Sequence, residues 1–108
     1  MRQLAIYRNN ILAGILTEEN RQDYRFEYDD KYFLLSDNQA ISLTLPKTQQ
    51  VFQSTFLFPF FYNMLSEGVN RKLQCMLLRI DENDDFSLLA KISQFDTIGA
   101  ITVKPLPL

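Results

Sequence analysis

Residues 56–68 read Phe56-Leu57-Phe58-Pro59-Phe60-Phe61-Tyr62-Asn63-Met64-Leu65-Ser66-Glu67-Gly68, and this stretch divides the chain into two halves. The pattern before it is typical of strands, and the pattern after it is typical of helices. Burying one Phe side chain stabilises a fold by roughly 1.5–3 kcal/mol. So dense an aromatic run presents apolar groups on more than one face. We therefore expect one face to serve the core and another to need a second layer or a partner.

The composition predicts one folded domain over residues 1–108. The chain is 46% hydrophobic and 22% charged, with a net charge of −2 and a pI near 5.0. The sequence has no cluster of Lys and Arg, so neither a nucleic-acid-binding surface nor a polybasic membrane-binding surface is indicated. Cys75 is the single cysteine, which fits a reducing compartment. Because the first residues lack a signal-peptide core and no apolar run is long enough to span a bilayer, we expect a cytoplasmic protein.

The residue types that most enzymes use are scarce in this chain. It contains no histidine, which is the commonest general base and metal ligand. Its three glycines are widely separated, so no glycine-rich phosphate loop is present. We therefore expect no catalytic residues, no metal site and no cofactor.

The first half of the chain predicts strands. In residues 3–8, Leu4 and Ile6 alternate with Ala5 and Tyr7, as in a strand. Asn9-Asn10 can form a two-residue hairpin turn that leads to a returning strand over 11–16, with Gly14 at a bulge or close contact. The clearest alternation is Tyr24, Phe26 and Tyr28, followed by a further strand over Ile41–Leu45. The remaining segments are a polar connection over 17–23, a turn at 29–31, a stretch at 32–35 compatible with helix or strand, and a loop over 47–53 with room for a short strand.

The second half predicts three short helices and a closing strand. Pro59 favours a helix start and Gly68 a helix end, so the first helix is expected from Pro59 to about Glu67. Asn70 can cap the second helix, in which four apolar residues share one face: Leu73, Met76, Leu77 and Ile80. Because Cys75 and Leu78 lie off this face, the helix is expected to be covered on two sides. A third helix follows Asn83 or Asp84, and a strand spans residues 99–104. The fold class is thus α+β, with a small antiparallel sheet packed against three short helices.

Several residues could carry chemistry, but each has a simpler structural interpretation. The acidic residues 81–85 could hold a cation, yet they lack the spacing of a calcium loop and suit a solvated turn with helix-capping carboxylates. Cys75 sits among apolar neighbours and suits a core position. Tyr24, Phe26 and Tyr28 could stack on nucleic-acid bases, but the acidic residues 27 and 29 and the net negative charge favour a buried sheet face.

The joint between the first two helices holds four polar residues beside the apolar run: Asn63, Ser66, Glu67 and Arg71. A local role in ending one helix and capping the next is one interpretation. The rim of a protein interface is the other.

At this joint the sequence resembles the HipA N-terminal domain family. Residues 60–68 followed by Arg71 are similar to its FFxNLLPEGxxR signature, and residues 41–46 resemble its ISLSLP segment. Residues 85–89 and 96–101 resemble two further segments of the family, in the expected order. Ser66 and Ser93 depart from the family pattern, where Pro and Gly are usual.

The resemblance implies a partner-binding function. In HipA toxins this domain precedes a serine/threonine kinase core, and this chain ends at Leu108, where that core would begin, so we expect a detached N-terminal module. Such modules resemble HipS, the antitoxin of three-component HipBST toxin–antitoxin systems. The implied partners are a HipT-like kinase bound in trans and a HipB-like DNA-binding protein in a ternary complex. An alternative is a structural subunit that complements a split kinase or its repressor complex without inhibiting it.

We expect the kinase contact at the helix joint, together with one face of the aromatic run. The residues predicted to bind the partner are Phe58, Tyr62, Asn63, Ser66, Glu67 and Arg71. Which phenylalanines belong to the core and which to the partner stays open at this point.

Overall fold

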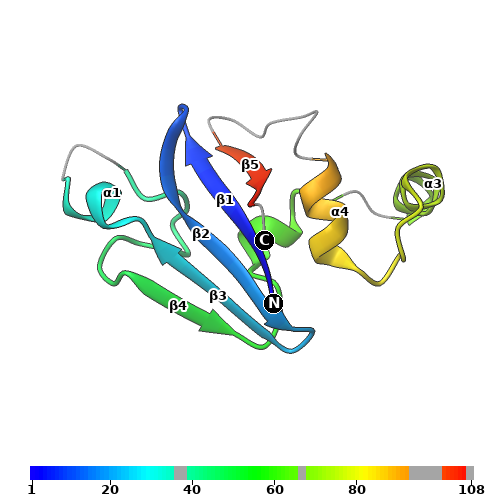
Figure 1. Cartoon of the computed structure of the whole chain (residues 1–108), viewed down its shortest axis with the longest axis horizontal. Coiled ribbons are helices and arrows are strands. Elements are labelled where there is room, and N and C mark those ends of the chain that lie inside the picture. Colours follow the sequence, from blue (N-terminus) through cyan, green and yellow to red (C-terminus); the bar gives the residue numbers. More distant parts are fainter. Residues whose placement is uncertain (36–38, 66–67, 93–100, 107–108) are drawn as a thin grey trace.

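A computed structural model describes residues 1–35, 39–65, 68–92 and 101–106. Its centre is a five-stranded antiparallel sheet in the order β4-β3-β2-β1-β5, with helices packed beside it (Figure 1). The strands are β1 (Arg2–Arg8), β2 (Ile11–Asn20), β3 (Asp23–Tyr28), β4 (Val51–Ser54) and β5 (Ile101–Pro105). The helices are α1 (Asp30–Leu34), α2 (Pro59–Tyr62), α3 (Gly68–Leu78) and α4 (Asp85–Ile92). The predicted α+β class is confirmed.

The β1–β2 hairpin forms where the sequence predicts it. Asn9 and Asn10 take φ angles of 51° and 67°, the left-handed pair that a tight hairpin turn needs. The register then shifts by one residue beside Gly14, which pairs with Ile6, so the predicted bulge is also present. The predicted connection over 17–23 is wrong for most of its length, because β2 continues to Asn20 and only two residues separate it from β3.

One face of the sheet carries the core. Tyr24, Phe26 and Tyr28 of β3 are all buried, which confirms the strand alternation and the buried-face interpretation. Phe61 of α2 packs on Phe26, with ring centroids 5.9 Å apart. Leu88 and Leu89 of α4 are fully buried in the same cluster. The central sheet, α2 and α4 therefore share one hydrophobic core, to which α3 contributes Cys75.

Two segments between β3 and β4 differ from the prediction. Residues 29–31 do not form a simple turn, since the Asp29 carboxylate caps α1 by accepting hydrogen bonds from the backbone N–H groups of Lys31 and Tyr32. Residues 41–45 form a turn instead of a strand. The Ser42 hydroxyl accepts from the Thr44 N–H at 3.2 Å, a local bond that competes with strand pairing.

The aromatic stretch forms a shorter helix than predicted. Pro59 begins α2 as expected, with Phe58 at its N-cap. The helix ends at Tyr62, because the next backbone bonds, Met64 N–H to Phe61 and Leu65 N–H to Tyr62, tighten to an i−3 pattern. The predicted end near Glu67 falls outside the described residues.

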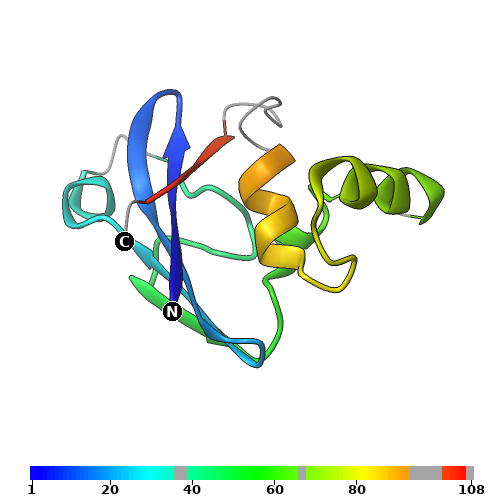
Figure 2. The same cartoon turned by 45° about the vertical axis from the view of Figure 1, so that its right-hand side comes forward.

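The second C-terminal helix begins earlier than predicted. Gly68 is the first residue of α3, so its predicted place at the end of the preceding helix and the predicted cap at Asn70 are both wrong. Figures 1 and 2 place α3 on the outer side of α4, away from the sheet.

The apolar side chains of α3 are not covered on two sides as expected. Leu73, Met76 and Leu77 are exposed, while Cys75 faces inward and is buried, as predicted for that residue. The third predicted helix corresponds to α4, which begins after Asp84 as expected, with its predicted end at Ser93 outside the described residues. The closing strand is β5, and the predicted first residues 99–100 also lie outside them.

The end of α3 is closed by a residue that strains the backbone. Arg79 has a φ of 58°, and the bonds Arg79 N–H to Met76 and Ile80 N–H to Cys75 form a Schellman cap around it. A non-glycine residue in this conformation costs about 1 kcal/mol.

Replacing Arg79 with Gly is therefore expected to raise the free energy of unfolding by about 0.5–1 kcal/mol, measured by urea denaturation. An equal gain from Lys72→Gly, which lies inside the same helix, would contradict this explanation.

Candidate partner-binding surface

The aromatic stretch places its residues at two depths. Phe58 and Phe61 are buried, with exposed fractions of 7% and 0%, whereas Tyr62 is 42% exposed at the end of α2. Asn63 is the C-cap of α2 and is also exposed. Because Phe58 lies inside the core, its side chain is not available as a surface contact. Tyr62 and Asn63 are available.

Tyr62 borders a pocket between α2, β3 and the start of α4. Its volume is about 270 Å³, and its lining combines aromatic and charged side chains: Arg21, Tyr24, Phe56, Leu57, Tyr62, Asn83 and Asp85. Phe56 is 76% exposed. Burial, and then the neighbouring Glu18 carboxylate, raise the pKa of Tyr24 to about 12, so its phenol stays protonated at neutral pH. We call this feature the Tyr62 pocket.

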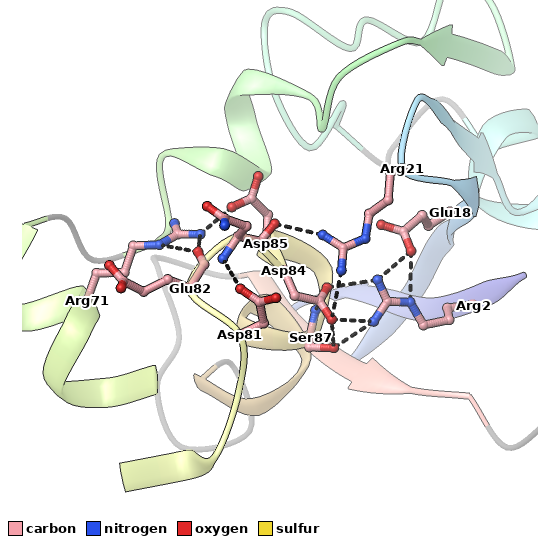
Figure 3. Close-up of polar contacts among 10 residues, drawn as sticks. Arg2, Glu18, Arg21, Arg71, Asp81, Glu82, Asp84, Asp85 and Ser87 are labelled. Carbon is pink, nitrogen blue, oxygen red and sulfur yellow. Dashed lines mark hydrogen bonds and ion pairs between the residues drawn. The ribbon is translucent and has the colours of Figure 1, made fainter. Parts of the chain in front are cut away.

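Arg71 is turned inward and holds α3 to the segment before α4. Its guanidinium pairs with the Asp85 carboxylate and donates to the Glu82 carbonyl oxygen from Nε at 3.1 Å and from a terminal nitrogen at 2.6 Å (Figure 3). Burial alone would lower the pKa of Arg71, but the hydrogen bond and charge of Asp85 outweigh it and raise that pKa. Arg71 thus shapes the surface, while Ser66 and Glu67 lie outside the described residues.

A second polar cluster ties the start of the chain to α4 (Figure 3). The Arg2 guanidinium pairs with Glu18, lies 2.8 Å from Asp84 Oδ1 and donates to Ser87 Oγ at 2.6 Å. Arg21 approaches the same Asp84 carboxylate at 3.7 Å. The sequence gives no local signal for this cluster, because its members lie up to 85 residues apart.

The acidic residues 81–85 act mainly within the fold. Asp84 caps α4 by accepting from the Ser87 N–H at 3.2 Å, which confirms the capping interpretation. Asp84 and Asp85 are not simply solvated, since guanidinium groups pair with both carboxylates. Within the part of the chain that the structure describes, no group of His, Cys, Asp and Glu side chains could hold a metal ion.

The Asp84 cluster makes stability depend on pH in the acidic range. Burial alone would raise the pKa of Asp84, but the hydrogen bonds from Arg2 and Ser87 outweigh it and lower that pKa to about 2. The stabilisation is therefore present above the ordinary pKa of 3.8 and is lost as the pH falls from about 4 to 2. We expect the difference in unfolding free energy between wild type and Asp84→Asn to shrink by about 2 kcal/mol from pH 5 to pH 2. A difference that stays constant over this range would contradict the assignment.

The fold and this surface define a class of protein. The model of the HipA N-terminal domain matches residues 4–104, so the chain belongs to the HipA N-terminal domain family. Domains of this family are non-catalytic. A solved N-terminal domain of HipA toxin superposes with a TM-score of 0.69 at 25% identity, covering 99% of this chain and 94% of that one.

Two relatives show the settings in which this domain occurs. An uncharacterized protein of Haemophilus influenzae is 31% identical over 91 residues, which are 84% of this chain and 80% of that protein. The Sinorhizobium fredii protein Y4mE, whose name assigns it provisionally to the kinases, is 26% identical over 105 residues. The match covers 97% of this chain but only 25% of Y4mE. No helix among the described residues is long and apolar enough to cross a membrane.

Proposed function

We propose that this chain is the antitoxin of a three-component HipBST-type toxin–antitoxin system and neutralises a HipT-like serine/threonine kinase in trans. The observation that carries the proposal is the exposed Tyr62 pocket on a domain whose family includes the N-terminal domain of HipA toxin. The similarity to a quarter of Y4mE supports a domain that also occurs attached to a larger chain. In this proposal the chain acts in the cytoplasm, and a HipB-like DNA-binding protein joins the complex.

The Tyr62 pocket has the chemistry of an interface centre. Aromatic side chains that combine an apolar body with a polar end dominate binding energy when a partner excludes water from them. Phe56 and Tyr62 supply that apolar area, and Arg21 and Asp85 supply charges of both signs at its border. We propose that the kinase buries Tyr62, with Asn63, Ser66 and Glu67 at the rim. Inhibition then results from blocking the active-site cleft or from holding a mobile part of the kinase.

The test is co-expression with the HipT-like kinase that this proposal expects in a neighbouring reading frame. Wild type is expected to rescue growth, and Tyr62→Ala to lose rescue because its affinity for the purified kinase falls about 30-fold, the loss of one hot-spot residue of about 2 kcal/mol. Leu34→Ala is the matched control, since Leu34 is 78% exposed on α1, far from the pocket. Circular dichroism checks that both variants are folded. Full rescue by Tyr62→Ala would rule out this surface, and no binding by wild type would rule out the function.

The alternative is a structural subunit that completes a split HipA-type kinase or its repressor complex without inhibiting it. The match to a quarter of the larger protein Y4mE supports this alternative, because there the domain is part of a longer chain. Both functions require binding, but they predict opposite effects. Enhanced toxicity on co-expression, together with higher kinase activity of the purified complex, would support the subunit and exclude the antitoxin.

A further inference from the structure

Helix α3 presents an apolar face to solvent. Val69, Leu73, Met76 and Leu77 are spaced by four, three and one residues, which places them on one side of a helix. Their exposed fractions are 80%, 52%, 73% and 75%. We call these four residues the outer face of α3. Single exposed apolar residues are ordinary, but a continuous set of four large ones marks an interaction surface.

The opposite side of α3 fixes the orientation of this face. Cys75 is 3% exposed, and the side chain of Arg71 is 14% exposed beside Asp85. The backbone cap at Arg79 holds the far end of the helix. The helix cannot turn its apolar side inward without breaking the Arg71–Asp85 pair and exposing Cys75. The outer face is therefore a stable feature of the folded domain.

The charged side chains of α3 and of the residue that directly follows it have one sign. Helix α3 contains no Asp or Glu, whereas Lys72 and Arg79 are exposed at its flanks. No ion pair within the described ranges involves either residue. A complementary occupant has an apolar centre and carboxylates at its edge.

A second copy of this chain does not fit that description. Pairing two α3 helices would bring Lys72 and Arg79 toward like charges. An 11-residue helix is also only about 16 Å long and about 10 Å wide. That face is far smaller than the roughly 800 Å² that each subunit of a stable dimer contributes, but it has the length and width of a single docked helix. A membrane surface fits poorly as well, because α3 is short and has one exposed cation beside this face, Lys72, with a second, Arg79, just after its end.

We propose that the outer face of α3 binds an amphipathic helix of another protein, apolar along one side and flanked by Asp or Glu. This inference goes beyond the proposed kinase inhibition, because it uses residues outside the Tyr62 pocket and gives the domain a second docking surface. Apolar contacts with Leu73 and Met76 supply the affinity, and pairing with Lys72 and Arg79 sets the preference for an acidic partner.

The test uses two synthetic helical peptides with the same leucine stripe, one flanked by Glu and one by Lys. In fluorescence anisotropy at 50 mM salt, we expect the folded full chain to bind the Glu-flanked peptide at least tenfold more tightly. Leu73→Asp is expected to weaken that binding at least 30-fold, and Lys72→Glu with Arg79→Glu to reverse the preference. Leu34→Asp, an equally drastic change at an exposed leucine of α1, is the matched control and should have no effect.

Other results would overturn the proposal. These are equal binding of both peptides, no binding of either, or Leu73→Asp binding like wild type. Sedimentation equilibrium that shows a dimer dissociated by Leu73→Asp would assign the face to a second copy. Tighter association with vesicles containing phosphatidylserine than with either peptide would assign it to a membrane. Because these assays contain no kinase, their failure is distinct from failure of the antitoxin function, which Tyr62→Ala tests.

Discussion

Replacing Arg2 with Met is expected to lower the free energy of unfolding by about 3 kcal/mol, since it removes one partner from a largely buried ionic cluster. The Arg2 guanidinium donates from Nε to Glu18 at 2.8 Å and from its terminal nitrogens to Asp84 at 2.8 and 3.1 Å. Glu18 is only 5% exposed. Without Arg2, the Glu18 carboxylate loses its cationic partner in a site that water barely reaches, so its desolvation is no longer compensated.

Arg2 contributes packing to the fold as well as charge. The guanidinium carbon lies 5.0 Å from the centre of the Phe86 ring, so the arginine also covers an aromatic face of α4. The Met side chain retains much of this apolar contact. The substitution therefore isolates the ionic contribution from the packing contribution.

Arg25→Met is the matched control for this experiment. Arg25 pairs with Glu19 at 3.7 Å, and both side chains are more than a third exposed. Pairs of this kind contribute about 0–1 kcal/mol. Adding Glu18→Gln to Arg2→Met should restore part of the lost stability, because it removes the uncompensated charge. If Arg2→Met and Arg25→Met cost the same in urea denaturation, the cluster does not stabilise the fold as inferred.

Replacing Gly14 with Ala is expected to destabilise the domain by about 3 kcal/mol through steric overlap. A Cβ atom at this position would lie 2.7 and 2.9 Å from two atoms of the Phe26 ring, and closer still to the Glu27 carbonyl oxygen. Gly14 pairs with Tyr28 across the β2–β3 ladder, so the added methyl group would push two central strands apart. Equilibrium urea denaturation measures the loss.

A double variant separates the two obstacles at Gly14. Phe26→Leu shortens the side chain but leaves the Glu27 carbonyl oxygen in place. We therefore expect Gly14→Ala to cost nearly as much in the Phe26→Leu background as in wild type. If the cost disappears there, the aromatic ring and not the backbone is what requires glycine.

The sequence predicts those parts of this fold that depend on neighbouring residues. The Asn9-Asn10 turn, the β3 alternation and the start of α2 at Pro59 follow from backbone preferences and side-chain period, and all are confirmed. Residues 41–45 show the limit of this reasoning. Ile41 and Leu45 are buried as a strand pattern requires, but the chain turns between them and leaves Leu43 99% exposed.

The candidate surface depends more on tertiary structure, so less of it could be predicted. An apolar stripe on a helix normally faces the core, yet that of α3 faces outward because Arg71 and Cys75 take the inward positions. Likewise, no sequence pattern shows that Phe58 is buried while Tyr62 is exposed, since both belong to one aromatic run. That difference follows from the packing of α2 on the sheet, through Phe61 and Phe26, and on α4.

The order of strands in the sheet has a consequence for the time at which this protein can act. Strand β1, which is synthesised before the other four strands of the sheet, lies between β2 and β5, and its Leu4 pairs with Pro105. One edge of β1 therefore stays unpaired until residues near the other end of the chain have been made. Completing the sheet requires contacts between residues about a hundred positions apart, which is a slow kind of pairing. A nascent chain that stops before β5 thus cannot complete the fold, however many of its surface residues have already been synthesised.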